Sequence, residues 1–190
     1  MTRGQVRMAV VLSVVFLVAA CNEDENGRVD GRSLTVKNCT TGVDRVFEPY
    51  TLEGDYISLD LASGIAFIRM QTRGRPLGLS DVLLVHIQDV SAMQARIGMP
   101  TPFDDTLVRA GLDVPDSCPD TRQPMGAVGE ITFSSLNVGL GERISATMTF
   151  DLMDLRTKEM VGFDFTASFD FEVQSGSDYL PFSVPGSTEP

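Results

Sequence analysis

The chain reads ISATMTFDL from Ile144 to Leu152 and VGFDFTASFDFEV from Val161 to Val173. In both stretches apolar residues alternate with polar residues or glycine. Because successive side chains of a strand point to opposite faces, each stretch predicts a strand with one face in a core and the other in water. The intervening residues 153–160 include charged side chains that suit an exposed hairpin turn. We therefore expect an antiparallel pair whose apolar faces lie on the same side.

Shorter apolar stretches predict further strands over residues 34–38, 56–61, 65–72, 82–90 and 128–138. Residues 91–112 differ, and we expect helical turns there, around Met93 to Ile97 and over residues 106–110. The prolines within residues 113–124 predict an ordered loop. Together these elements predict an all-β fold, an antiparallel β-sandwich with a short helical or loop insertion. A β-barrel that carries an apolar ligand would show the same alternation and stays open.

The N-terminus has the pattern of an export signal. Arg3 and Arg7 are the only charged residues among the first 22, and residues 8–20 carry no charge. A helix over residues 8–20 would be about 20 Å long, too short for a hydrocarbon core of about 30 Å. Residues 1–20 therefore predict a signal peptide rather than a membrane span.

The segment Val18-Ala19-Ala20-Cys21 resembles the lipobox of bacterial lipoprotein precursors. The resemblance implies cleavage after Ala20, acylation of Cys21 and lasting attachment to a membrane through several acyl chains. Asn22, not aspartate, follows the cysteine, which in enteric-type sorting implies the bacterial outer membrane. The expected location is thus the outer membrane or cell envelope, with the body outside the cytoplasm. Cleavage at an A-x-A-type site that leaves a soluble protein is the alternative.

Residues 22–33 contain one apolar residue, Val29, among several charges. Such a segment buries too little apolar surface to offset the entropy of ordering it, so we expect it to be flexible. The sequence thus predicts three parts. These are a signal peptide over residues 1–20, a lipidated tether over residues 21–33, and a single β-sandwich domain over residues 34–190.

The chain is acidic, with 15 Lys and Arg against 26 Asp and Glu and a net charge of −11. Loss of residues 1–20 removes Arg3 and Arg7, which leaves 13 basic against 26 acidic residues and a net charge of −13. A surface this acidic repels phosphate backbones, so we expect no nucleic-acid partner. The partners we do expect are a membrane, reached through the acyl anchor on Cys21, and a protein or an envelope polymer.

Cys39 and Cys118 remain once Cys21 is assigned to lipidation. An even pair of cysteines in an exported protein predicts a disulfide. The chain-entropy estimate for a loop of this size is a stabilisation of about 4.5 kcal/mol. Two free buried thiols are the alternative.

Common catalytic motifs are missing from the sequence, which has no G-x-S-x-G elbow, no G-x-x-x-x-G-K-[ST] loop and no H-E-x-x-H pair. His86 is the sole histidine, and its apolar surroundings favour a packed side chain over a catalytic one. Close carboxylates such as Asp170 and Glu172 can act as acid and base in glycoside hydrolysis. These two share a strand face with Asp164, however, and such a face is typical of solvated β surface. We therefore expect no catalytic residue and no cofactor.

The 113–124 loop contains the candidates for a metal site. Asp113, Asp116 and Asp120 could supply oxygen ligands for Ca²⁺, but their spacing matches no EF-hand. Neighbouring prolines make turn formation a sufficient explanation, so we expect no metal there. Core packing likewise accounts for the aromatic stripe of the last stretch, although it could line an apolar cavity. The stripe comprises Phe163, Phe165, Phe169 and Phe171.

The C-terminal part of the chain resembles uncharacterised predicted lipoproteins of myxobacteria-like species, in Cys118-Pro119-Asp120, Arg143-Ile144-Ser145 and Val161-Gly162-Phe163-Asp164-Phe165. This resemblance implies no activity. Our hypothesis is a lipid-anchored extracytoplasmic β-domain with a non-catalytic binding or structural role at the bacterial envelope. The alternatives are a carrier of an apolar ligand in a barrel or sandwich cavity, and an envelope hydrolase.

Overall fold

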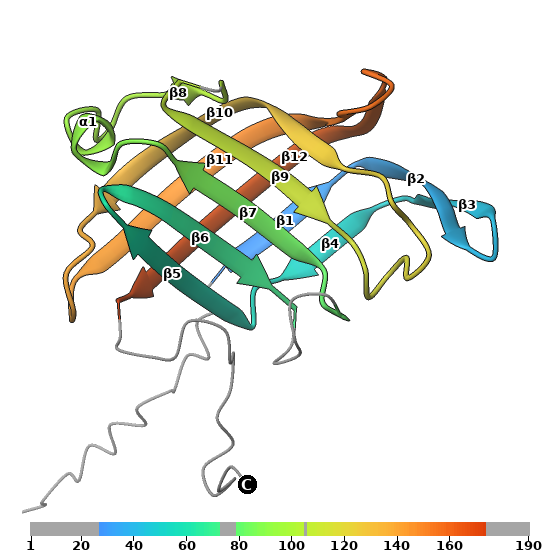
Figure 1. Ribbon diagram of the computed structural model, residues 1–190, viewed down its shortest axis with the longest axis horizontal. Coiled ribbons are helices and arrows are strands. Elements are labelled where there is room, and N and C mark those ends of the chain that lie inside the picture. The colour runs from blue at the N-terminus through green and yellow to red at the C-terminus, as the bar shows by residue number, and fades with distance from the viewer. Residues whose placement is uncertain (1–26, 73–78, 105, 174–190) are drawn as a thin grey trace, which may run out of the picture.

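The computed structural model describes residues 27–72, 79–104 and 106–173. Strands make up most of this part of the chain, and α1 (Val90–Gln94) is the one helix within it (Figure 1). The strands are β1 (Gly27–Gly31), β2 (Ser33–Thr40), β3 (Val43–Phe47), β4 (Tyr50–Glu53), β5 (Tyr56–Ala62), β6 (Ile65–Gln71), β7 (Val82–Ile87), β8 (Thr101–Pro102), β9 (Val108–Asp113), β10 (Met125–Leu136), β11 (Arg143–Asp154) and β12 (Met160–Glu172).

The strands form one antiparallel sheet in the order β3-β2-β12-β11-β10-β9-β7-β6-β5. β1 also pairs with β12 and carries β4 on its other side, while β8 pairs with β10. The predicted hairpin is present, since Ile144 pairs with Phe171 and Met148 with Ala167. The expected all-β antiparallel fold is therefore confirmed.

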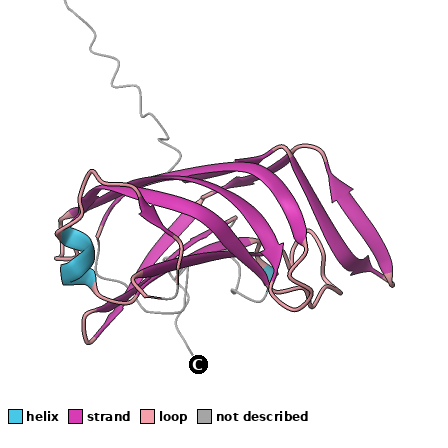
Figure 2. Cartoon of the chain, turned by 90° about the horizontal axis from the view of Figure 1, so that it is seen from above, coloured by secondary structure: helices cyan, strands magenta, loops and turns pink. Residues whose placement is uncertain are grey.

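The sheet is strongly curved, so that the β1–β4 pair lies across the core from β6 and β7 (Figure 2). Met70 of β6 packs against the opposite layer, because a Cβ on Gly27 or on Gly54 would lie only 2.2 or 2.5 Å from its side chain. Tyr50 of β4 donates its hydroxyl to Asp81, immediately before β7, at 3.3 Å. The two layers of the predicted sandwich are thus parts of a single continuous sheet.

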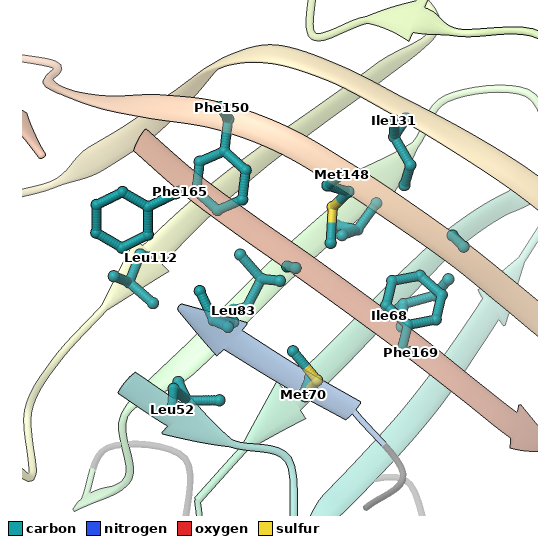
Figure 3. Close-up of a cluster of buried hydrophobic side chains, with 14 of the residues drawn as sticks. Leu52, Ile68, Met70, Leu83, Leu112, Ile131, Met148, Phe150, Phe165 and Phe169 are labelled. Atoms are coloured by element: carbon teal, nitrogen blue, oxygen red, sulfur yellow. The ribbon is translucent and has the colours of Figure 1, made fainter. Parts of the chain in front are cut away.

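Side chains from both layers meet in the core (Figure 3). The Phe150 and Phe165 rings stack with centroids 5.4 Å apart, and the Phe133 and Phe169 rings lie edge to face at 6.2 Å. Phe165 and Phe169 are both buried. At these two positions the aromatic stripe packs into the core, as the alternation predicts.

Residues 106–110 do not form the helical turn that we predicted. Val108–Asp113 is strand β9, which lies between β7 and β10. Val108 and Leu112 are buried on its inner face. The alternation of these residues, and the packing that it permits, decide the structure of this segment.

The expected helical insertion is α1, which begins earlier than the sequence suggested. The Asp89 carboxylate accepts a hydrogen bond from the backbone N–H of Ala92 at 2.9 Å and caps the first turn. Met93 is buried and fixes the helix on the body. The 113–124 segment links β9 to β10 as the loop that we predicted.

Residues 27–33 belong to the described fold, so the flexible tether predicted over residues 21–33 is wrong for this part of the segment. β1 lies between β12 and β4 and pairs with both. Its central residue, Val29, is 0% exposed. The segment belongs to the core structure, so the domain already includes residues 27–33.

The polar composition of β1 gives little indication that the strand belongs to the core structure. Arg28 and Asp30 face outward and pair with each other at 2.6 Å, while the single apolar residue between them faces inward. The glycine at the end of the strand reflects close packing rather than flexibility, because a Cβ on Gly31 would lie 2.4 Å from the Phe165 ring.

The predicted signal peptide and Cys21 fall within residues 1–26, outside the described residues. In the ranges that the structure covers, no helix has both the length and the apolar character needed to cross a membrane.

Candidate functional site

β12 contains a bulge where it pairs with β11. Positions 150 and 152 of β11 pair with positions 165 and 162 of β12, so Phe163 and Asp164 lie opposite the single residue Asp151. Asp164 has a φ of 54°, a left-handed conformation that aspartate tolerates better than most residues. Phe163 is 38% exposed. Its expected inward position is therefore wrong, because the extra residue shifts the period of the strand.

Two neighbouring segments hold this bulge in place. Asp151 accepts a hydrogen bond through Oδ1 from the backbone N–H of Asp164 at 2.8 Å. Arg32, between β1 and β2, donates through Nε to Asp164 Oδ2 at 2.5 Å and through its backbone N–H to the Phe163 carbonyl at 3.1 Å. The Arg32 guanidinium also lies 6.0 Å from the centroid of the Phe163 ring.

The bulge borders an open hollow on the outer face of the sheet, with a volume of about 380 Å³. Its walls supply two carboxylates, two hydroxyls and an aliphatic side chain. This volume lies in the lower part of the range for small-molecule sites. The lining residues, which define the bulge hollow, are Val128, Gly129, Thr149, Phe150, Asp151, Asp164, Phe165 and Thr166.

Several polar atoms in the bulge hollow are available to a ligand. Thr149 and Thr166 pair across β11 and β12, and neither hydroxyl has a hydrogen-bond partner among the described residues. Asp151 uses Oδ1 and Asp164 uses Oδ2 within the bulge. The second oxygen of each carboxylate makes no hydrogen bond within the same part of the chain. The hollow can therefore accept hydrogen bonds at two carboxylates and exchange them at two hydroxyls.

Hydroxyl side chains continue along the outer face beyond the hollow. Thr147 of β11 pairs with Thr132 on one side and with Ser168 on the other. Next to this row, Arg143 binds Asp170 through two hydrogen bonds of 2.5 and 2.7 Å. Asp170, which we considered as a catalytic carboxylate, is thus part of an exposed ion pair.

Exposed apolar side chains lie beside the hollow on β10–β12. Val128 lines the hollow and is 47% exposed. Leu155 packs over Gly126, which pairs with Met153, and Met153 pairs in turn with Met160. We define the outer apolar patch as the exposed residues Val128, Leu155, Met160 and Phe163.

The predicted disulfide between Cys39 and Cys118 is present, with an S–S distance of 2.03 Å. It joins β2 to the 113–124 loop. Asp120 reinforces the junction, since its backbone N–H donates to the Cys39 carbonyl at 3.2 Å and its Oδ2 accepts from the Thr41 N–H at 2.6 Å. The loop and the β2–β3 hairpin, which projects at the right of Figure 1, are thereby fastened together.

Sequence reasoning missed the buried carboxylate of Asp81, which binds the part of this loop that directly precedes Cys118. Its Oδ1 accepts from the backbone N–H groups of Asp116 and Ser117, both at 3.0 Å. Its Oδ2 accepts from the hydroxyls of Ser117 and Tyr50. Burial raises the pKa of the Tyr50 phenol well above its usual range, and the charge of Asp81 adds to this effect. The one sequence signal was an aspartate placed directly before an apolar run.

The three calcium candidates do not converge on one site. Asp120 binds the backbone of Thr41, Asp116 lies against Asp81, and Asp113 ends β9, where burial raises the pKa of its carboxyl. Within the described ranges, no group of three or more His, Cys, Asp or Glu residues is placed to hold a metal ion.

His86 is a packed histidine on the outer face of β7. Its ring stacks on Phe67 with centroids 4.2 Å apart, and its Nδ1 accepts a hydrogen bond from Arg109 Nε at 2.9 Å. Burial, and then the charge of Arg109, lower the pKa of His86. Its neutral ring is held between an arginine and a phenylalanine, which agrees with the interpretation from the sequence.

Comparison with protein-family models, with curated proteins and with solved structures finds no match to this chain.

Proposed function

We propose that this chain is a lipid-anchored extracytoplasmic β-domain with a non-catalytic binding role, held at the bacterial outer membrane or cell envelope by acyl chains on Cys21. The disulfide between Cys39 and Cys118 carries the proposal. Disulfides persist in oxidising compartments outside the cytoplasm. The bond therefore supports export independently of the lipobox-like segment that ends at Cys21.

The position of β1 in the sequence places the described fold close to Cys21. Only residues 22–26 separate Cys21 from β1, and a fully extended chain of this length spans about 20 Å. An acylated Cys21 would therefore keep Gly27 close to the membrane surface. The backbone N–H of Gly54 donates to the Gly27 carbonyl at 2.8 Å, so the β4–β5 link would lie at the same end.

The outer face of β12 extends away from this anchored end. Gly27 pairs with Phe169, and Asp164 precedes Phe169 by five positions. At about 3.4 Å per residue, the bulge would lie about 17 Å beyond Gly27 along the strand. This arrangement supports a role in which the bulge hollow and the outer apolar patch meet a partner beyond the membrane surface.

Packing in the core favours binding on the outer face over carriage of an apolar ligand inside. The Phe150, Phe165 and Phe169 rings lie in ring-to-ring contacts, and the Met70 side chain reaches the opposite layer. These contacts pack the aromatic stripe against neighbouring core side chains, which supports a structural role for its buried rings.

Mass spectrometry of the full protein purified from its own cells tests the proposal. We expect a chain that begins at Cys21, carries fatty acyl mass there and contains the Cys39–Cys118 bond. Cys21→Ser should abolish the acyl mass and move the protein from the membrane to the soluble fraction. Asn22→Gln is the matched control, because it alters the neighbouring residue, introduces no aspartate and leaves the acylated thiol in place. A native chain with residues 1–20 intact and no acyl mass would overturn the proposal.

A further inference from the structure

The chemistry of the bulge hollow specifies what kind of ligand it can hold. Each of Asp151 and Asp164 has a carboxylate oxygen without a partner among the described residues, and Thr149 and Thr166 each have such a hydroxyl. Carboxylates only accept hydrogen bonds when ionised, whereas hydroxyls both donate and accept. A matching ligand therefore presents several hydroxyl donors within a short distance of one another.

Charge selects against anionic ligands. Two carboxylates line the hollow, and Arg32 is the cation bound to one of them. The whole chain carries a net charge of −11, so the long-range field also repels anions. The two carboxylates would repel a phosphate, a uronic acid or a nucleotide at this site, whereas an uncharged ligand would not be repelled.

The hollow also offers apolar contact. Val128 forms part of its wall and is about half exposed. Phe163, just outside, presents part of its ring to solvent beside Asp164. A ligand with a C–H face on one side and hydroxyls on the other would use both kinds of surface, and sugar rings have this character.

We propose that the bulge hollow binds a sugar unit of an uncharged glycan, with Asp151 and Asp164 accepting hydrogen bonds from its hydroxyls and Val128 packing against its C–H face. This inference rests on the binding role proposed above and names the class of partner. Thr149 and Thr166 supply the remaining hydrogen bonds. The row of Thr132, Thr147 and Ser168 lies beyond the hollow on the same face, so neighbouring units of the polymer would lie along the sheet.

Isothermal titration calorimetry of the full chain in detergent tests the inference, with cellohexaose, maltohexaose and chitohexaose as neutral probes. We expect saturable binding of at least one probe. Asp151→Asn should weaken that binding about tenfold, because a charged acceptor is lost, and Thr166→Val about threefold to tenfold. Asp44→Asn is the matched control, since this residue lies on β3, away from the hollow and from the row of hydroxyls. It should leave the affinity unchanged, and urea unfolding of each variant verifies that it folds.

Each result decides the question. Absence of binding to all three neutral probes, or binding that neither hollow variant weakens, overturns the inference. Equal binding of a polyuronic acid probe, or binding of Ca²⁺ alone at Asp151 and Asp164, overturns it as well. If the chain is acylated but binds no glycan, this inference fails and the proposed anchored module stands. If the chain binds glycan but is not acylated, the proposed anchor fails and the glycan site stands.

Discussion

The side chain of Asp151 accepts a hydrogen bond from the backbone N–H of Asp164 at 2.8 Å. This bond crosses the point where the bulge interrupts the hydrogen bonding between β11 and β12. One carboxylate thus replaces a lost inter-strand hydrogen bond and lines the bulge hollow as well. Because the same carboxylate holds the bulge and lines the hollow, the stability of the bulge and the shape of the candidate site depend on each other.

Asp151→Ala should lower the free energy of unfolding by about 1–2 kcal/mol, because the Asp164 N–H loses its acceptor. Asp151→Asn should cost less, since an amide oxygen can accept the same hydrogen bond. Urea unfolding of the two variants checks this order. Equal losses for both substitutions would argue that the hydrogen bond contributes nothing.

Tyr50 should make the stability of the protein depend on alkaline pH. Its pKa is raised in the folded state, first by burial and then by Asp81, whereas the unfolded value is about 10. The unfolded phenol loses its proton first, so this contribution is fully present below pH about 10 and is lost as the pH rises further.

Unfolding free energies of the wild type and of Tyr50→Phe, measured between pH 8 and pH 11, test this dependence. The wild type should lose more stability than the variant above pH about 10. Tyr56, whose pKa is raised to a lesser degree by partial burial, provides the control substitution Tyr56→Phe. Parallel pH curves for the wild type and Tyr50→Phe would contradict the prediction.

Removal of the disulfide should destabilise the protein by about 2–5 kcal/mol, because it cross-links cysteines separated by 79 positions. The double variant Cys39→Ala with Cys118→Ala should match the reduced wild type in denaturant midpoint. A reduced protein as stable as the oxidised one would show that the backbone contacts of Asp120 hold the loop without the covalent bond.

Gly31→Ala should destabilise the protein by about 1–3 kcal/mol, because the added Cβ would press against the Phe165 ring in the core. Gly139→Ala is the control, since its Cβ would meet only the side chain of Glu142. Thermal unfolding compares the two. If Gly31→Ala is as mild as the control, β1 is not the packed strand described above.

Period-two alternation made the main hairpin predictable. Residues from Ile144 to Leu152 keep strict alternation, and their register with β12 follows it on both sides of the bulge. The disulfide was equally predictable from the sequence, because so few cysteines allow few pairings. These features depend on local pattern and composition, which a single sequence displays directly.

The bulge and the first strand could not be derived in the same way. Phe163 follows the alternating pattern and yet faces outward, because one extra residue in β12 is accommodated by the left-handed conformation of Asp164. Val29 is a lone apolar residue whose burial depends on β12 and β4, and both follow it in the sequence. Each outcome is decided by tertiary partners, and the outer apolar patch was missed for the same reason.

The pairing of β1 with β12 brings together strands from opposite ends of the described chain. Contacts between residues so distant in sequence close late and slow folding. A polypeptide that leaves a ribosome or a translocation pore from its N-terminus must therefore keep β1 unpaired on one side until Phe169 has emerged. Chaperones that shield exposed strands would matter most during that interval. Deletion of β12 would leave β1 with an unpaired edge.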